Sequence, residues 1–267
     1  GYSFVAAGDL LARRVLPNKS LMLTFDDGYY NFVKSLPILR EYQVPATLFA
    51  CPGYSVDSQS FWWDALYRNA RAHGACEGEV RKEMGRCRRL SFDEVYQYVT
   101  ERWGKDALKI ASDLDRPLMM DELRDVASDP LVYIGNHTYW HTALPFQSAD
   151  QIREQVRRAE QVLETEVGYR PELISYPNGD YSDCMINVCR DAGYAFGMTL
   201  EASGYSSLSH ATRMSIGRFM LAGDRDIPRQ ANSIGSPYSV ASAIRRMKRH
   251  KFSEPHDLRA FTYDSKQ

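Results

Sequence analysis

Two adjacent carboxylates, Asp26 and Asp27, follow the apolar run 21–25 and precede Gly28. Like charges at this distance repel each other, and burying either one costs free energy unless something neutralises it. One interpretation is an ordinary turn from strand to loop, where Asp and Gly are common. The other is a metal site in which one carboxylate is a ligand and the other a base. The pair alone leaves both interpretations open.

Two histidines, His137 and His141, lie four residues apart directly after the apolar stretch 131–135. If this segment begins a helix, residues four apart share a face and both imidazoles can bind one ion. The alternative is two unrelated surface histidines, although the chain has only six His in all. Two imidazoles and one carboxylate form a set of three ligands with an open position, which is typical of a catalytic metal site.

The elements around the acid pair predict a βαβ unit. A second strand-like run covers 44–53, and the segment from Tyr30 to Tyr42 between the two strands has helical spacing. Pro37 lies inside that segment, so we expect a kink or an irregular first turn there. Active sites of parallel α/β folds gather at the carboxyl ends of the strands. The acid pair therefore occupies a position suited to chemistry.

Residues 54–117 have a different character, which predicts a helical insertion within the α/β core. The segment FWWDALYRNARA has an amphipathic pattern, and Ser91 with Glu94 forms a capping box at the start of a second helix. The segment KDALKIASDL is expected to continue in helical form. The aromatic side chains are expected to pack in the core of this insertion more than to contact a ligand. Its role, in the substrate groove or in a subunit contact, stays open.

The motifs TFDDG and HTxxH together resemble the polysaccharide deacetylase family, carbohydrate esterase family 4, also described as the NodB-like homology domain. The resemblance runs from about residue 5 to about residue 225, interrupted by the insertion. It implies an α/β fold, a distorted (β/α) barrel with about seven parallel strands, in a single domain over residues 1–267. The implied activity is metal-dependent removal of N-acetyl groups from an amino sugar in a polysaccharide or glycoconjugate.

The resemblance also assigns roles to individual residues. Asp26 matches the general base, and Asp27, His137 and His141 match the metal ligands. One divalent ion is expected, with Zn²⁺ favoured and Co²⁺ and Ni²⁺ also accepted by this ligand set. In the implied mechanism, a metal-bound water attacks the N-acetyl carbon, and Asp26 takes the proton from that water.

The third family motif is altered in this chain. In the matching segment, LISYPNGDYSD, Ser175 stands where the family carries Arg. The backbone N–H of Asn178 is a candidate donor to the reaction oxyanion, although an ordinary Pro-Asn-Gly turn explains this segment equally well. A replacement arginine is Arg218, on a strand expected at 214–221, which we predict to orient Asp26.

The family's Leu-x-His motif, which supplies a general acid, is not found. His210 is the best substitute, and the alternative is a histidine that is simply solvated in a loop. General acid assistance contributes about 10²–10⁴-fold to the rate, so a slow enzyme is expected without it.

Composition excludes several other classes of protein. There are 33 Lys and Arg against 34 Asp and Glu, a net charge of −1, which argues against a nucleic-acid binder. Basic runs at 81–89 and 245–251 are expected to be solvated helix faces more than phosphate sites. No apolar stretch approaches the ~20 residues that span a membrane.

Five cysteines without a CxxC pair argue against a zinc ribbon or a disulfide scaffold, and Cys184 and Cys189 are expected to be buried thiols.

Other functions remain open at this level. One is hydrolysis of a non-sugar amide or cyclic imide by the same fold, and another is carbohydrate binding without catalysis. The expected partner is an N-acetylated glycan or glycolipid, and the oligomeric state is not predicted. The family resemblance favours the cell envelope or secretion, whereas the odd cysteine count and the lack of a visible signal peptide allow a cytoplasmic location.

Overall fold

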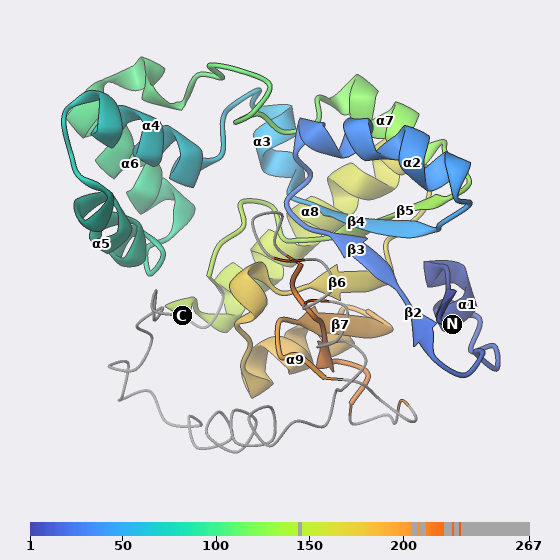
Figure 1. Ribbon diagram of the computed structural model, residues 1–267. Helices are drawn as coiled ribbons and strands as arrows, with labels where there is room; N and C mark the ends of the chain where they lie inside the picture. The colour runs from blue at the N-terminus through green and yellow to red at the C-terminus, as the bar shows by residue number, and fades with distance from the viewer. Residues whose placement is uncertain (144–145, 204–207, 209–211, 222–225, 227–229, 231–267) are drawn as a thin grey trace.

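The computed structural model describes residues 1–143, 146–203, 208, 212–221, 226 and 230. Within them, a parallel sheet has six strands in the order β3-β4-β5-β6-β7-β8, and a separate parallel pair joins β1 to β2 (Figure 1). This confirms the expected α/β barrel-like fold, with six strands in the main sheet where about seven were expected. The strands are β1 (Ser3–Phe4), β2 (Ser20–Leu21), β3 (Leu23–Phe25), β4 (Ala46–Ala50), β5 (Val132–Asn136), β6 (Leu173–Ser175), β7 (Phe196–Thr199) and β8 (Ile216–Gly217).

The predicted βαβ unit is present at the start of the sheet. Strands β3 and β4 pair in parallel, with Phe25 opposite Leu48. A 3₁₀ helix, η1 (Tyr30–Ser35), leads into helix α2 (Leu36–Glu41), in which Pro37 occupies the first turn. A proline is tolerated there because the first N–H groups of a helix have no partner within it. The irregular first turn that Pro37 predicts is therefore observed.

The sheet is buried by helices α7 (Met120–Ala127) and α8 (Ala149–Val167), which contact β5 and each other. Leu48, Ile134 and Leu163 have no exposed surface and belong to one apolar cluster with α2 and α7. Helix α9 (Asp183–Asp191) packs on α8 farther along the sheet. These contacts fix the strands whose carboxyl ends carry the polar motifs.

Between β4 and α7 the chain forms a further group of helices, of which the first lies beside the sheet and the others are drawn apart from it in Figure 1. Their apolar faces form one cluster of their own, which reaches Tyr139 and Trp140 beside the histidine motif. That this group is an insertion into the family fold stays a prediction. The elements are α3 (Pro52–Val56), α4 (Trp62–Ala72), α5 (Glu77–Cys87), α6 (Phe92–Trp103) and the 3₁₀ helix η2 (Lys105–Leu108).

The local predictions for these helices are met in part. The Ser91 hydroxyl accepts the Glu94 N–H at 3.3 Å, and the Glu94 carboxylate accepts the Ser91 N–H at 2.7 Å, so the capping box is present. The prediction that KDALKIASDL continues in helical form is wrong beyond Leu108. Gly104, with φ of 89°, ends α6 in a conformation that glycine adopts without strain, and only one 3₁₀ turn follows.

The strand expected at 214–221 is confined to Ile216–Gly217. Cys184 is exposed, contrary to expectation, because it lies on the outer side of α9, whereas Cys189 is buried. His210 and the basic run 245–251 lie outside the described residues. In the part of the chain that the structure describes, no helix is both long and apolar enough to cross a membrane.

Candidate metal centre and active site

Three side chains with ligand atoms meet at the carboxyl ends of β3 and β5. Asp27 Oδ1 lies 3.3 Å from His137 Nε2 and 3.3 Å from His141 Nε2. One ligand atom from each residue lies within 4.8 Å of the others. His137 is buried, and the side chains of Asp27 and His141 retain only partial exposure. Two imidazole nitrogens and one carboxylate oxygen therefore converge on one point, although Asp27 lies more than 100 positions before the two histidines in sequence.

The segment that carries the histidines is a loop, so the two imidazoles do not meet through the helical face considered from their spacing. Thr138 and His141 have φ of 65° and 52°, which no right-handed helix contains. The loop is held by side chains: Asn136 Oδ1 accepts the Thr138 N–H at 2.7 Å, and Gln155 Oε1 accepts the Trp140 N–H at 2.9 Å. Two left-handed residues, not a helical repeat, turn both imidazoles toward Asp27.

The orientation of His137 suits a metal ligand. Its Nδ1 lies 2.7 Å from the carbonyl oxygen of Ser175. A carbonyl only accepts hydrogen bonds, so Nδ1 carries the proton and the Nε2 lone pair faces Asp27. This arrangement, with nitrogen and oxygen ligands, fits Zn²⁺, Co²⁺ or Ni²⁺ on chemical grounds.

The turn after β3 separates the two neighbouring carboxylates. Asp27 has φ of 74° and Gly28 has φ of 87°, and Asp and Gly are among the residues that adopt this region most readily. The Asp27 carbonyl accepts the Cys51 N–H at 3.1 Å, and the Gly28 carbonyl accepts the Leu118 N–H at 2.8 Å. Because this conformation is fixed, Asp27 reaches both histidines, while Asp26 faces Arg218 and comes near His137 only.

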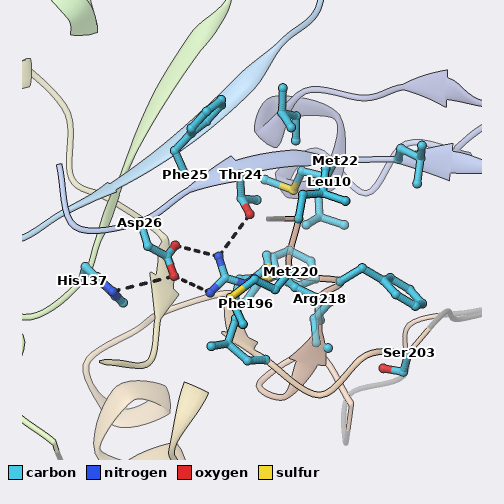
Figure 2. A pocket seen from close by; sticks show the side chains of 18 of the residues that line it. Leu10, Met22, Thr24, Phe25, Asp26, His137, Phe196, Ser203, Arg218 and Met220 are labelled. Atoms are coloured by element: carbon cyan, nitrogen blue, oxygen red, sulfur yellow. Dashed lines mark hydrogen bonds and ion pairs between the residues drawn. The ribbon is translucent and has the colours of Figure 1, made fainter. Parts of the chain in front are cut away.

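Asp26 forms a two-point ion pair with Arg218. The two guanidinium nitrogens donate to the two carboxylate oxygens at 2.7 Å each, and the guanidinium also donates to Thr24 Oγ1 at 3.1 Å (Figure 2). Ser175 Oγ accepts from Arg218 at 2.8 Å and donates to Asp26 Oδ2 at 3.3 Å. Asp26 Oδ2 also lies 3.8 Å from His137 Nε2. Arg218 thus reaches Asp26 as the sequence predicts, next to the serine that stands where the family has arginine.

The pKa values of Asp26, His137 and His141 are shifted in different directions. Burial by itself raises the pKa of Asp26, but the charges of His137 and Arg218 outweigh it and lower that pKa to about 2. Burial lowers the pKa of His141 to about 4, so this imidazole is neutral near pH 7 and has a free lone pair. Burial also lowers the pKa of His137, but Asp26 and Asp27 outweigh it and the net shift is upward. The same two carboxylates would attract a divalent cation.

Replacing Arg218 by Met is expected to move the acidic limb of the kcat/KM profile to higher pH. Arg218 stabilises the ionised form of Asp26, so its loss raises the Asp26 pKa. If Asp26 is the general base, its active, ionised form is then lost at a higher pH than in the wild type. The measurement is kcat/KM against pH for both proteins, with Arg153→Met on the exposed face of α8 as control. An unmoved acidic limb would refute the role of Arg218 in orienting and charging Asp26.

Asn178 lines the same cleft as Asp26 and Asp27. It has φ of 59° within the short 3₁₀ helix η4 (Pro177–Gly179), a conformation that Asn tolerates better than most residues. Its position is compatible with an oxyanion donor, and that role stays a prediction. The role of His210 as general acid also stays a prediction, because this residue lies outside the described part of the chain.

One contact at this site is missed by sequence reasoning. Trp63 of α4 has its ring centroid 4.8 Å from that of His141, and its Nε1 donates to Tyr29 Oη at 2.6 Å. The Tyr29 hydroxyl in turn donates to the Asp64 carboxylate. Trp63 also stacks on Phe61, so it is a packing residue that contacts a candidate ligand as well. The signal available in the sequence is Asp64, an acid within the otherwise apolar and aromatic stretch 61–67.

Replacing Trp63 by Ala is expected to weaken metal binding by about 10-fold, because residues that support a ligand typically contribute 10–100-fold to affinity. The measurement is a Zn²⁺ titration against a competing chelator. Trp103→Ala is the matched control, since Trp103 packs against the same apolar cluster and does not line the cleft. If both variants lose Zn²⁺ affinity equally, Trp63 contributes only through general packing and has no specific effect on His141.

A family model described as polysaccharide deacetylase matches residues 13–197, which is more than half of the chain. The chain belongs to the polysaccharide deacetylase family. The match includes both motifs, TFDDG and HTxxH, and ends before β8, so it leaves out Arg218.

The poly-β-1,6-N-acetyl-D-glucosamine N-deacetylase of Escherichia coli is 28% identical over 229 residues. The alignment covers 82% of this chain but only 30% of that relative, so the chain spans about a third of its length. The Streptococcus pyogenes deacetylase PplD superposes with a TM-score of 0.58 at 17% identity, covering 90% of this chain and 81% of that one. A de-N-acetylase from Aggregatibacter actinomycetemcomitans gives 0.55 at 17% identity, covering 87% and 83%. Both structural likenesses support the shared polysaccharide-deacetylase fold.

Proposed function

We propose that this member of the polysaccharide deacetylase family is a metal-dependent hydrolase that removes N-acetyl groups from an amino sugar in a polysaccharide or glycoconjugate. The observation that carries the proposal is the convergence of Asp27, His137 and His141 next to a separate carboxylate, Asp26, which Arg218 holds. The activity named for the Escherichia coli relative supports the reaction type.

In this proposal Asp27, His137 and His141 hold one divalent ion, for which Zn²⁺ is the first candidate and Co²⁺ and Ni²⁺ are alternatives. Bound there, such an ion supplies Lewis acidity, which polarises a carbonyl and makes water more acidic.

Asp26 acts as the general base. Its carboxylate is ionised because the charges of His137 and Arg218 lower its pKa, and the two-point contact with Arg218 keeps it pointed into the cleft instead of joining the metal ligands. A carboxylate with a low pKa is a weak base, so Arg218 improves the orientation of Asp26 at the expense of its basicity. We therefore expect a modest kcat.

Two tasks remain in the proposed reaction: stabilising the oxyanion, which we assign to the turn after β6, and protonating the leaving amine. The Asn178 N–H donates to the oxyanion that forms as the N-acetyl carbon becomes tetrahedral. The leaving amine takes its proton either from His210 or from Asp26 after Asp26 has accepted one from water. The proposed partner is an N-acetylated glycan or glycolipid, and the proposed location is the cell envelope or outside the cell.

The test is acetate release from N-acetylglucosamine oligomers by metal-loaded protein, followed by mass spectrometry of the products. Both β-1,4- and β-1,6-linked oligomers are used, since the Escherichia coli relative is named for the latter. Loss of acetyl groups from either supports the proposal. Hydrolysis of a formamide or cyclic imide without any acetate release would favour the non-sugar amidohydrolase instead. Oligomer binding without hydrolysis of any substrate would favour a carbohydrate-binding relative.

A further inference from the structure

Among the charged side chains that line the cleft around the candidate active site, positive ones outnumber negative ones. The volume of the cleft is about 2410 Å³, and the described residues that line it include eight Lys and Arg but only two acids, Asp26 and Asp27. The whole chain, in contrast, has nearly equal numbers, 33 basic and 34 acidic residues. The excess of cations is therefore a property of this cleft and not of the composition.

Only four of the eight basic side chains that line the cleft form a salt bridge with a residue that the structure describes. Arg218 pairs with Asp26, and three others pair with acids just outside the cleft: Arg14 with Asp9, Arg81 with Glu77 at 3.8 Å, and Arg88 with Asp180. The other four form no salt bridge with any residue in the described part of the chain. These are Arg13, Lys19, Lys82 and Arg213.

Helix α5 forms one basic wall of the cleft. Arg81, Lys82, Gly85 and Arg88 all line it, and the spacing of 81, 85 and 88 places these residues on one helix face. A Cβ added at Gly85 would meet no atom within 4 Å, so this face has open space before it. The sequence pattern predicts a solvated face here, and the structure turns that face toward the catalytic cleft.

This wall extends to the candidate metal centre. Arg88 lines a small pocket together with His141 and Asn178. Its charge is also among the causes that lower the pKa of His141. A ligand that contacts the basic side chains of α5 would therefore lie close to the candidate metal ligand His141 and to Asn178.

We propose that the substrate is an N-acetylated glycan that itself carries negative charge, a uronate or a phosphate, bound along the α5 wall. This inference rests on the proposed function and names its substrate class. A cleft lined by one sign of charge concentrates ligands of the opposite sign, and arginine is well suited to carboxylate and phosphate. A neutral glycan can accept hydrogen bonds from the four cations without salt bridges, but it gains no attraction between opposite charges to offset the hydration that the covered cations lose.

The test compares three substrates with metal-loaded wild-type protein. They are a neutral N-acetylglucosamine pentamer, an oligomer that alternates N-acetylglucosamine with uronate, and N-acetylglucosamine linked through diphosphate to a lipid. We expect kcat/KM for at least one charged substrate to exceed the neutral value by about 10-fold at low salt. That advantage should largely disappear at about 0.5 M salt, where charges are strongly screened. Whichever charged substrate is preferred tells whether the anion belongs to the polymer or to the lipid linkage.

The α5 wall is tested by Lys82→Glu, with Arg86→Glu as the matched control. Arg86 lies on the same helix and is exposed, but it does not line the cleft. The ratio of kcat/KM for charged over neutral substrate should fall about 5–10-fold in Lys82→Glu and stay unchanged in Arg86→Glu. If Lys82→Glu does not fold, the inference is tested by the salt dependence of the wild-type kcat/KM for charged and neutral substrates.

Equal, salt-independent kcat/KM for neutral and charged substrates would overturn the charged-substrate inference and leave the deacetylase function intact. Failure to release acetate from all three substrates, with metal bound, would instead overturn the function itself.

Discussion

Asp26→Asn is expected to lower kcat by about 10²–10⁴-fold, the contribution of a positioned general base. Asn keeps the shape of the side chain and an oxygen that accepts from Arg218, but it cannot take a proton from water. Metal binding should persist, because the candidate ligands are Asp27 and the two histidines. The measurements are kcat on an N-acetylglucosamine oligomer and the metal content of the same sample.

The matched control is Asp129→Asn. Asp129 is a buried carboxylate that, like Asp26, is paired with an arginine, Arg40 at 2.7 Å, but it precedes β5, at the opposite end of that strand from His137. Its replacement should lower the melting temperature and leave kcat close to the wild-type value. Full activity in Asp26→Asn would refute the base role and with it the proposed mechanism.

His137→Ala is expected to abolish both activity and stable metal binding, with a fall in metal affinity of more than about 100-fold. Supporting residues alone contribute 10–100-fold, and a ligand contributes more. A metal ion that binds only the folded protein stabilises it by about 2.7 kcal/mol at 100 times its dissociation constant. Zn²⁺ should therefore raise the melting temperature of the wild type and leave that of His137→Ala unchanged.

His73→Ala is the control for this change, because His73 is an exposed histidine at the end of α4. It should retain the metal, the activity and the thermal shift with Zn²⁺. If His137→Ala keeps a Zn²⁺-dependent thermal shift equal to that of the wild type, the ion binds elsewhere and the candidate centre is wrong.

The sequence determines much of this site because its motifs are local. The apolar run into Asp26 and Asp27 specifies a strand followed by a left-handed turn that Asp and Gly adopt readily. The capping pair Ser91 and Glu94 and the position of Pro37 likewise specify helix starts through contacts a few residues apart. Such contacts depend on neighbours in the chain, so pattern reasoning finds them.

Other features depend on packing between distant segments and became visible only in the tertiary structure. The spacing of His137 and His141 suggests a helix, but a loop fixed by Asn136 and Gln155 brings them together. The contact of Trp63 with His141 and the orientation of the α5 face toward the cleft follow from how the helices after β4 pack together and against the loop that carries the histidines. A repeat in the sequence says which residues share a face, but the neighbouring elements decide what that face meets.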